Sequence, residues 1–280
     1  MNSLNLKEKT TVLFDLDGTL LPMELEEFTN TYFALLAKKA APIGYEPKPL
    51  VAAVWKGTKA MVKNDGSELN CSRFWEVFSQ EMGRESLKLR EPFDEFYAKE
   101  FHGAKTATWE NPLAKKAVDG LKKRGFELML ATNSLFPAVG VNTRLSWVGL
   151  SLSDFSYVTT YENSSYCKPN PDYFGEILEK TGKQPEECLM VGNDVDEDLA
   201  ALERGNRCVS HYRLSDQQIR QGSDRDIHGH VCRVSYDDGS ELTLPHTPDG
   251  RGFSMFAENS KNFFRTVAFA TRNVQSFGVS

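Results

Sequence analysis

The sequence predicts an α/β fold in which a parallel β-sheet core carries an inserted domain of helices. Two observations lead to this prediction. From residue 111 onward, short apolar runs alternate with helical segments, an order typical of parallel sheets with right-handed crossovers. Between residues 22 and 110, apolar residues instead recur at helical spacing, without strand alternation. A chain of 280 residues, 40% of them apolar, is long enough for one large domain or two smaller ones.

Composition excludes several classes of partner. The net charge of -6 and the pI near 5.5 argue against a nucleic-acid surface or a polybasic membrane anchor. No apolar run is long enough to span a bilayer, and the polar segment Met1–Thr10 has no secretory signal. We expect a soluble, cytoplasmic protein with no nucleic-acid or membrane partner, and the oligomeric state stays open. The cysteines are scattered without a Cys-x-x-Cys pair, which suits a reducing compartment: Cys71, Cys167, Cys188, Cys208 and Cys232.

The first predicted strand, Val12–Phe14, runs directly into two acidic residues. Asp15 and Asp17 are one residue apart, and Gly18 marks a turn. Two carboxylates about 4 Å apart repel by about 4 kcal/mol at an effective dielectric constant near 20. A protein that retains such a pair supplies a cation, a shared proton or solvent. Taken alone, the pair is better explained as a solvated turn, so other segments must decide its role.

Helical periodicity covers the inserted region. Proline-rich and Asn-Asp-Gly-Ser segments separate four predicted helices, Leu25–Ala40, Pro49–Lys63, Ser72–Met82 and Pro92–Phe101. Their aromatic residues are expected to form the packing core of these helices rather than a ligand site: Phe74, Trp75, Phe78, Phe93, Phe96 and Tyr97.

The second half of the chain continues as alternating helices and strands. Asn111 and Asn170 are expected N-caps, each followed by a proline at the first helical position. The predicted elements are a helix Leu113–Arg124, a strand Phe126–Ala131, a helix Phe136–Trp147, a strand Phe155–Thr160, a helix from Pro171 to Gly182, a strand Cys188–Val191 and a helix Val195–Arg204.

Polar residues follow the predicted strands at the points where these strands end. They are Asp15 and Asp17 after the first strand, Thr132 and Asn133 after the second, Lys168 after a short loop, and Asn193 and Asp194 after the last. Ligands of open α/β sheets bind at the carboxyl ends of the strands. Four separate segments are therefore predicted to meet at one edge, which solvated turns do not explain.

These segments together resemble the haloacid dehalogenase superfamily in its phosphatase branch. The run Asp15-Leu16-Asp17-Gly18-Thr19 is similar to the first motif of that family, Thr132 to its second, Lys168 in a Lys-Pro-x-Pro context to its third, and Gly192 to Asp198 to its fourth. The resemblance covers residues 11 to about 205. It implies a Rossmann-like core formed by residues 1–21 and 111–205, with a helical cap at 22–110.

The resemblance implies a role for each motif residue. Asp15 would attack phosphorus and form an aspartyl-phosphate, and Asp17 would protonate the leaving group and then activate water. The phosphate-binding residues would be Gly18, Thr132, Asn133 and Lys168. The residue types fit, because backbone N–H groups, a hydroxyl and an ammonium all bind phosphate oxygens. The alternatives are structural: a turn hydrogen bond for Asp17, an N-cap for Thr132 and a solvated Lys168.

A magnesium site is implied by the same motifs. Mg²⁺ prefers hard oxygen ligands and keeps several waters. The resemblance places a carboxylate oxygen of Asp15, the backbone carbonyl of Asp17 and one side chain of the fourth motif on the metal. Asn193 stands where an aspartate is commoner, so we expect Asp194 to bind and leave Asn193 as the alternative. Asp198, one turn later, is expected to act through water, whereas Asp196 and Glu197 are interpreted as solvated helix acids.

The predicted function is a Mg²⁺-dependent phosphatase that hydrolyses a small phosphorylated metabolite. The cap would close over the site and exclude water, and Phe28, Tyr32 and Trp55 are candidates for lining it. One alternative is a phosphomutase of the same superfamily. Another is a catalytically weak phospholigand-binding protein, which Asn193 and the unusual tail motivate. Dehalogenation fits the acidic first and fourth motifs less well.

The tail from 206 to 280 departs from the pattern. Residues 206–214 are too polar for the buried parallel strand that the family places there, so we expect an incompletely covered sheet edge and low order after about 206. Only 262–277 is faintly helical. One hypothesis is a frameshift near Gly205, because chosen synonymous codons for 209–219, read from their second base, encode an apolar strand and turn. Sequencing the gene tests it, and the alternative is a diverged accessory tail.

Overall fold

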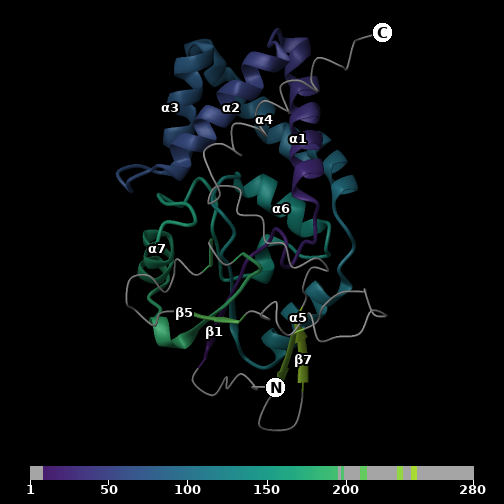
Figure 1. The fold of residues 1–280 in the computed structure, drawn as a ribbon, viewed down its shortest axis with the longest axis vertical. Helices are drawn as coiled ribbons and strands as arrows, with labels where there is room; N and C mark the ends of the chain where they lie inside the picture. Colours follow the sequence, from purple (N-terminus) through teal and green to yellow (C-terminus); the bar gives the residue numbers. More distant parts are fainter. Residues whose placement is uncertain (1–8, 195–196, 199–208, 213–231, 236–240, 245–280) are drawn as a thin grey trace.

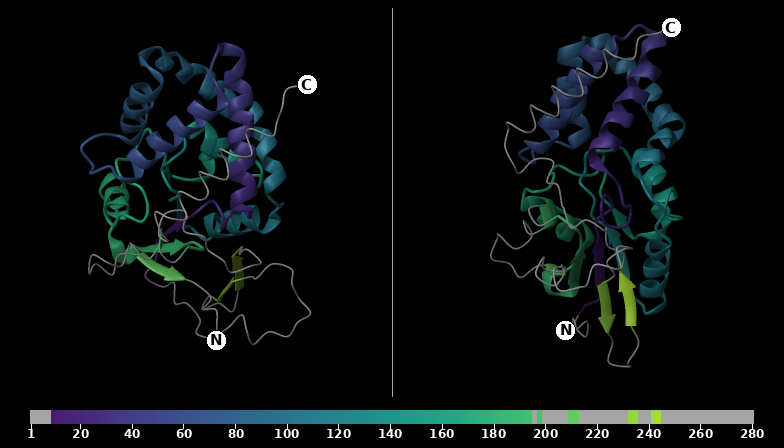
Figure 2. Two further views of the ribbon diagram at one scale, coloured as in Figure 1. Left: turned by 45° about the horizontal axis from the view of Figure 1, so that its top comes forward. Right: turned by 45° about the vertical axis from the view of Figure 1, so that its right-hand side comes forward.

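The computed structural model describes residues 9–194, 197–198, 209–212, 232–235 and 241–244 (Figure 1). Helices α1 to α4 gather at one end of the molecule and the sheet lies at the other, an arrangement that Figure 2 shows from two further directions. The helices of the cap region are α1 (Leu25–Ala40), α2 (Pro47–Val62), α3 (Asn70–Met82) and α4 (Arg90–Ala98), with 3-10 turns at Ala41–Ile43, Arg84–Leu89 and Glu100–Ala107.

The larger sheet has five strands in the order β3-β2-β1-β4-β5, and every neighbouring pair is parallel. Phe14, the last residue of β1, lies opposite Leu130 of β2 and Val191 of β4, so the three strands end at the same level. The α/β parallel core is therefore confirmed. The strands are β1 (Thr11–Phe14), β2 (Glu127–Leu130), β3 (Tyr157–Val158), β4 (Cys188–Val191) and β5 (Val209–Tyr212).

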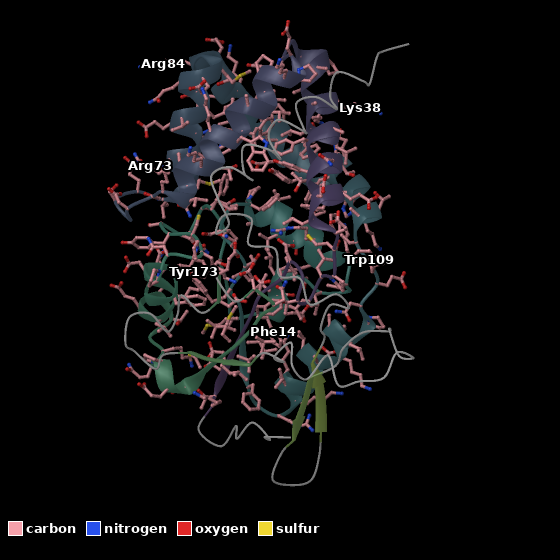
Figure 3. The ribbon with its side chains drawn as sticks, in the orientation of Figure 1. Phe14, Lys38, Arg73, Arg84, Trp109 and Tyr173 are labelled. Carbon is pink, nitrogen blue, oxygen red and sulfur yellow. The ribbon has the colours of Figure 1, made fainter. Side chains whose placement is uncertain are left out.

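Both faces of this sheet are covered by helices. The core helices are α5 (Pro112–Lys123), α6 (Ala138–Ser146) and α7 (Asp172–Thr181). Phe14 belongs to the large apolar cluster that includes Val118 of α5, whereas its neighbour Leu13 packs with Tyr173 of α7. Successive strand residues thus face opposite sides, as strand geometry requires, and α5 and α7 lie on either side of β1 (Figures 1 and 3).

Aromatic side chains fill the interior of the cap. All six aromatic residues that were predicted to form the helix-packing core are buried. Phe28, Tyr32 and Trp55 are buried as well, at 4%, 7% and 6% exposure. The rings of Phe28 and Tyr32 both pack edge-on against Phe101, and the Trp55 ring lies 5.1 Å from that of Phe33. These three residues are part of the aromatic core of the cap, and the lining of a binding site by them stays a prediction.

The chain enters and leaves the cap through two adjacent segments. Met23 and Thr108 form an antiparallel bridge, and the Trp109 N–H donates to the Pro22 carbonyl at 3.1 Å. Trp109 lies at the side of the molecule between cap and sheet, and its side chain is 56% exposed (Figure 3). The domain boundaries at 22 and 110 stay a prediction, and this pairing brings them side by side.

Helix ends differ from prediction in three instructive places. The helix predicted at Pro92–Phe101 is divided, because Lys99 (φ -123°, ψ -81°) leaves the helical conformation between α4 and the following 3-10 turn. Asn111 occupies the N-cap position of α5, but its side-chain amide donates to the Leu20 carbonyl at 3.0 Å instead of capping. α7 begins at Asp172 with Pro171 at its N-cap, one residue later than predicted, and the Asn170 side chain accepts from the Asp172 N–H at 2.9 Å.

The tail contains strands that were not expected. β5 (Val209–Tyr212) pairs in parallel with β4, so that edge of β4 is covered. The prediction was wrong because ladder hydrogen bonds use backbone groups, which polar residues supply equally well. β6 (Cys232–Ser235) and β7 (Glu241–Leu244) form an antiparallel hairpin within a region predicted to have low order. The remaining expectations for the tail, including the faint helix at 262–277, concern residues that lie outside the described part.

Among the residues described, no helix is long and apolar enough to cross a membrane.

Candidate active site

The nucleophile candidate stands where β1 ends. Asp15 follows Phe14, its N–H donates to the Val191 carbonyl at 2.9 Å, and its side chain is 10% exposed. The Thr19 hydroxyl lies 3.3 Å from Oδ2 of Asp15 and 3.0 Å from Oδ1 of Asn193. The first and fourth motifs are therefore joined through one hydroxyl group, and two hard oxygen atoms face it.

Gly18 permits this close approach. Its φ of 83° is in the left-handed region, and a Cβ at this position would collide with the Asn193 side chain. Its N–H donates to the Leu21 carbonyl at 2.8 Å, whereas the prediction directed this group toward phosphate. In this structure the glycine closes the turn after Asp15 and leaves space for Asn193.

Lys168 supplies the positive charge beside Asp15. Its side chain is fully buried, and Nζ lies 3.0 Å from Oδ1 of Asp15 and 2.8 Å from Oδ1 of Asp198. Burial disfavours the charged amine, but the carboxylates of Asp15 and Asp198 outweigh it and raise the pKa of Lys168 well above its ordinary value. The ammonium group therefore stays charged between two acids.

The pKa of Asp15 is shifted in the opposite sense from that of an ordinary ion-paired acid. The pKa is raised to about 7: burial is the largest cause, the Lys168 ammonium opposes the rise, and the carboxylates of Asp198 and Asp17 add to it. Among the residues described, two carboxylates and one ammonium act on Asp15, so a bound cation at this position would favour the ionised form.

Asp17 has a different counter-charge, Arg144 of α6. Nη1 of Arg144 forms a short ion pair with Oδ2 of Asp17, and the guanidinium lies 4.2 Å above the centre of the Phe136 ring. Arg144 is fully buried, while the Asp17 side chain is 31% exposed. Within the described residues, Oδ1 of Asp17 and the Nε and Nη2 atoms of Arg144 are buried without hydrogen-bond partners. The two aspartates are therefore held by separate cations.

The second motif lies beside the third. The Thr132 carbonyl accepts from the Tyr173 hydroxyl at 2.7 Å, and the Thr132 side chain is 1% exposed. The side-chain amide of Asn133 donates to the Lys168 carbonyl at 3.3 Å and to Oε1 of Glu197 at 3.2 Å. Asn133 thus links the end of β2 to the segments that carry Lys168 and Glu197.

Glu197 is not a solvated helix acid, which corrects the sequence-based interpretation. Its carboxylate turns toward Asn133, and burial raises its pKa to about 8, with Lys168 opposing this shift and Asp194, Asp15 and Asp198 adding to it. Periodicity could not reveal this environment, because it depends on a strand that lies more than 60 positions earlier in the chain. Asp196, interpreted in the same way, lies outside the described part.

Asn193, Asp194 and Asp198 have distinct surroundings. Asn193 faces Thr19 and Gly18, whereas Oδ1 of Asp194 accepts the Glu197 N–H at 3.0 Å and so caps the following helical turn. The second carboxylate oxygen of Asp198 accepts the Asp194 N–H at 3.3 Å. Asp198 is thereby fixed against Lys168.

A sequence model of haloacid dehalogenase-like hydrolases matches residues 9–206, well over half of the chain. The chain belongs to this family. Pyrophosphatase PpaX of Bacillus velezensis is 24% identical over 201 residues, 72% of this chain and 82% of that protein. A phosphoglycolate phosphatase of Vibrio vulnificus is 34% identical over 123 residues, 44% and 50% of the two chains. A crystal structure of a predicted phosphoglycolate phosphatase from Haemophilus somnus aligns with a TM-score of 0.39 and 19% identity, covering 76% of this chain and 91% of that one.

The oxygen atoms of this hydrolase fit a hard divalent cation. In the part of the chain that is described, no three His, Cys, Asp or Glu side chains form a metal-binding group. Mg²⁺ does not require three such residues, since it keeps several waters and binds one or two carboxylates. Asp15 and Asn193 present oxygens to one shared hydroxyl, and the excess negative charge around Asp15 favours a cation. Asp15 and Asn193 therefore have side-chain oxygens placed where they could hold Mg²⁺.

Arg144, like Glu197, is a residue of the site that was not predicted from the sequence. A signal for it existed, because Gly140, Trp147 and Val148 surround it at helical spacing on the apolar face of the predicted helix. A charged residue on such a face requires a buried partner. The partner, Asp17, is 127 positions away, so the sequence alone did not identify it.

Proposed function

We propose that this hydrolase is a Mg²⁺-dependent phosphatase that acts on a small phosphorylated metabolite through an aspartyl-phosphate on Asp15. The observation that carries the proposal is the buried Asp15 carboxylate at a strand end, 3.0 Å from the fully buried ammonium of Lys168. A nucleophilic carboxylate next to a fixed positive charge is what phosphoryl transfer requires, because the transferred oxygens carry negative charge.

The residues divide the reaction between them. Asp15 attacks phosphorus, and Lys168, fixed by Asp198, stabilises the charge on the phosphoryl oxygens. Oδ1 of Asp17, which is buried and has no hydrogen-bond partner among the residues described, gives a proton to the leaving oxygen and later takes one from the attacking water. Asp15, the Asp17 carbonyl and Asn193 would hold Mg²⁺, which would supply positive charge against the phosphate oxygens. Asn193 is preferred to Asp194 as the side-chain ligand, since Asp194 caps the helical turn.

The names of the relatives support the substrate class. One is called a pyrophosphatase and the other a phosphoglycolate phosphatase, and both names describe small substrates. A cap seated over the carboxyl ends of the strands also favours small molecules over proteins. A cytoplasmic location stays a prediction from cysteine usage and composition.

Two alternatives make different predictions. A phosphomutase would return the phosphoryl group to the substrate, so it would yield an isomerised product without free phosphate. A weak phospholigand-binding protein would bind phosphate with Mg²⁺ and show no turnover. The separate pairing of Asp17 with Arg144, which leaves Oδ1 of Asp17 without a partner, favours a working acid–base group over this second alternative.

The Asp15→Asn variant tests the proposal. The amide cannot attack phosphorus, so we expect release of phosphate from p-nitrophenyl phosphate with Mg²⁺ to fall at least about a thousandfold. Asp119→Asn is the matched control, because Asp119 pairs with Lys115 on the outer side of α5 and should leave turnover unchanged. Unchanged turnover in Asp15→Asn, or full activity of the original protein in excess chelator, would reject the proposal.

A further inference from the structure

Asn70 is a cap residue whose side chain is completely buried against the core. It is the first residue of α3, and its side-chain nitrogen lies 3.1 Å from the Ser134 hydroxyl, 3.2 Å from the Tyr166 carbonyl and 3.3 Å from the sulfur of Cys167. All three acceptors belong to the core. A fully buried amide surrounded by acceptors of another domain indicates a specific contact rather than general packing.

The position of Asn70 is fixed from both sides. Its Oδ1 accepts from the side-chain amide of Asn64 at 2.9 Å, and its backbone N–H donates to the Ser164 carbonyl at 2.9 Å. A Cβ at Gly66 would collide with the Tyr166 hydroxyl, so the segment between α2 and α3 lies directly on the core. The Asn70 side chain therefore has little freedom to choose other partners.

The partners of Asn70 immediately adjoin two of the phosphate-binding candidates. Ser134 directly follows Asn133, and Cys167 directly precedes Lys168. The Ser134 hydroxyl also donates to the Tyr166 carbonyl at 2.6 Å, which joins the two segments beneath Asn70. A shift of either segment would move Lys168 or Asn133 relative to Asp15.

We propose that Asn70 is a positioning residue, through which the docked cap fixes the phosphate-binding geometry of Asn133 and Lys168. The inference rests on the proposed function, because it concerns the same phosphate site. With the cap docked, the amide holds the segments after β2 and before Lys168 at a fixed separation. With the cap lifted, Ser134 and the Tyr166 carbonyl lose this shared donor, and the site loses its arrangement. Docking of the cap on the core and the affinity of the site for phosphate are thereby coupled.

The experiment compares Asn70→Ala with Thr143→Val, a matched loss of one buried contact between core and cap. The Thr143 hydroxyl of α6 donates to the Tyr97 carbonyl of α4 at 2.8 Å. Thr143 precedes Arg144, the partner of Asp17, and is not next to Asn133 or Lys168 in the chain, so it is a control for phosphate affinity and not for turnover. Calorimetric titration with inorganic phosphate in the presence of Mg²⁺ measures affinity. We expect about tenfold weaker phosphate binding in Asn70→Ala, since buried acceptors lose their donor, and unchanged affinity in Thr143→Val.

Alkylation by iodoacetamide, followed by mass spectrometry, gives a second readout. Cys167 lies under Asn70, while Cys188 is equally buried elsewhere in the core and serves as an internal reference. Asn70→Ala should increase the labelling of Cys167 relative to Cys188 several-fold. Equal phosphate affinity in Asn70→Ala and Thr143→Val at equal loss of thermal stability overturns the proposal, because the contact would then be merely structural.

Ser134→Ala removes the same contact from the core side, so the proposal can still be tested if Asn70→Ala does not fold. It should weaken phosphate binding, and the double variant should bind no more weakly than either single variant; additive losses would contradict the shared role.

Failure of the proposed function would give a different result. The unmodified protein would then bind phosphate without hydrolysing any phosphomonoester, and the affinity and labelling comparisons would still decide the role of Asn70.

Discussion

The sheet end and the interior of the cap both contain fully buried side chains, but the contacts differ in kind. At the sheet end, Lys168, Asp198 and Arg144 are fully buried charged side chains. In the cap, rings such as Phe78 and Phe96 are buried to the same degree and pack against other rings. Removing one charge from the first region leaves its partner uncompensated, whereas removing a ring from the second leaves a cavity.

This difference separates function from stability. Buried ion pairs contribute little net stability compared with apolar packing, so their presence at the sheet end indicates chemistry. Ring packing carries no chemistry but supplies a large share of the free energy of unfolding. Substitutions at the sheet end should therefore lower kcat as well as stability, whereas substitutions in the cap interior should lower stability with little effect on kcat.

The largest effect is expected for Lys168→Met. The side chain keeps its size, but Asp15 and Asp198 lose their shared cation, so we expect about 3–5 kcal/mol of lost stability and a fall in kcat of about a thousandfold. Urea unfolding and phosphate release measure the two quantities. Lys180→Met is the control, since its ion pair with Glu176 is partly exposed and worth less than about 1 kcal/mol. Equal stability losses for the two variants would show that burial of the Lys168 ion pairs is not what makes them costly to break.

Phe96→Ala should act on stability with little effect on chemistry. Phe96 is fully buried, and its ring lies 5.3 Å from that of Tyr97 and 5.9 Å from that of Phe101. We expect the free energy of unfolding to fall by about 3–5 kcal/mol, with kcat within a few-fold of normal at temperatures where the variant is folded. Phe96→Leu should lose less than about 1.5 kcal/mol. A kcat loss as large as that of Lys168→Met would show that the cap interior takes part in catalysis.

Arg144→Met tests whether charge at the sheet end serves the proton-transfer step. Without Arg144, Asp17 loses its fixed orientation, so we expect kcat for an alkyl phosphate to fall by about a hundredfold. The loss should be much smaller for p-nitrophenyl phosphate, whose leaving group needs no protonation. Arg84→Met, at the outer end of the cap (Figure 3), is the control. Equal losses with both substrates would assign Arg144 a role other than orienting Asp17.

The smallest effect concerns pH. Burial raises the pKa of Asp15 to about 7, so below that pH the carboxyl group is protonated and must release its proton before binding a cation. Mg²⁺ should therefore bind about tenfold more weakly at pH 6 than at pH 8, as calorimetry can measure. Asp15→Asn has no such proton, and its Mg²⁺ affinity should be weaker and nearly independent of pH. A pH dependence that survives this substitution would point to another group.

Local patterns were sufficient for most of the fold. α1 begins and ends at the predicted residues, Leu25 and Ala40, because apolar spacing and the following prolines mark both ends. β4 likewise matches its apolar run, Cys188–Val191. β5 was missed because its residues are polar, and the pairing that makes it a strand comes from β4.

The site was predictable where residues follow strands directly or, as with Lys168, after a loop. Asp15, Asn193 and Lys168 meet as expected, since parallel strands end at one edge. Arg144 and Glu197 were not found, because their environments depend on partners far away in the chain. Residue type and periodicity describe what a side chain is, whereas its partner is decided by the folded topology.

The antiparallel bridge between Met23 and Thr108 has a consequence for how this hydrolase could be rebuilt. Because Met23 and Thr108 are bridged, residues 24–107 begin and end at nearly the same place. Closing that gap with a short turn would cost little chain entropy. The cap could therefore be replaced by another insert of similar end-to-end distance, and the path of the chain from β1 to α5 would not change.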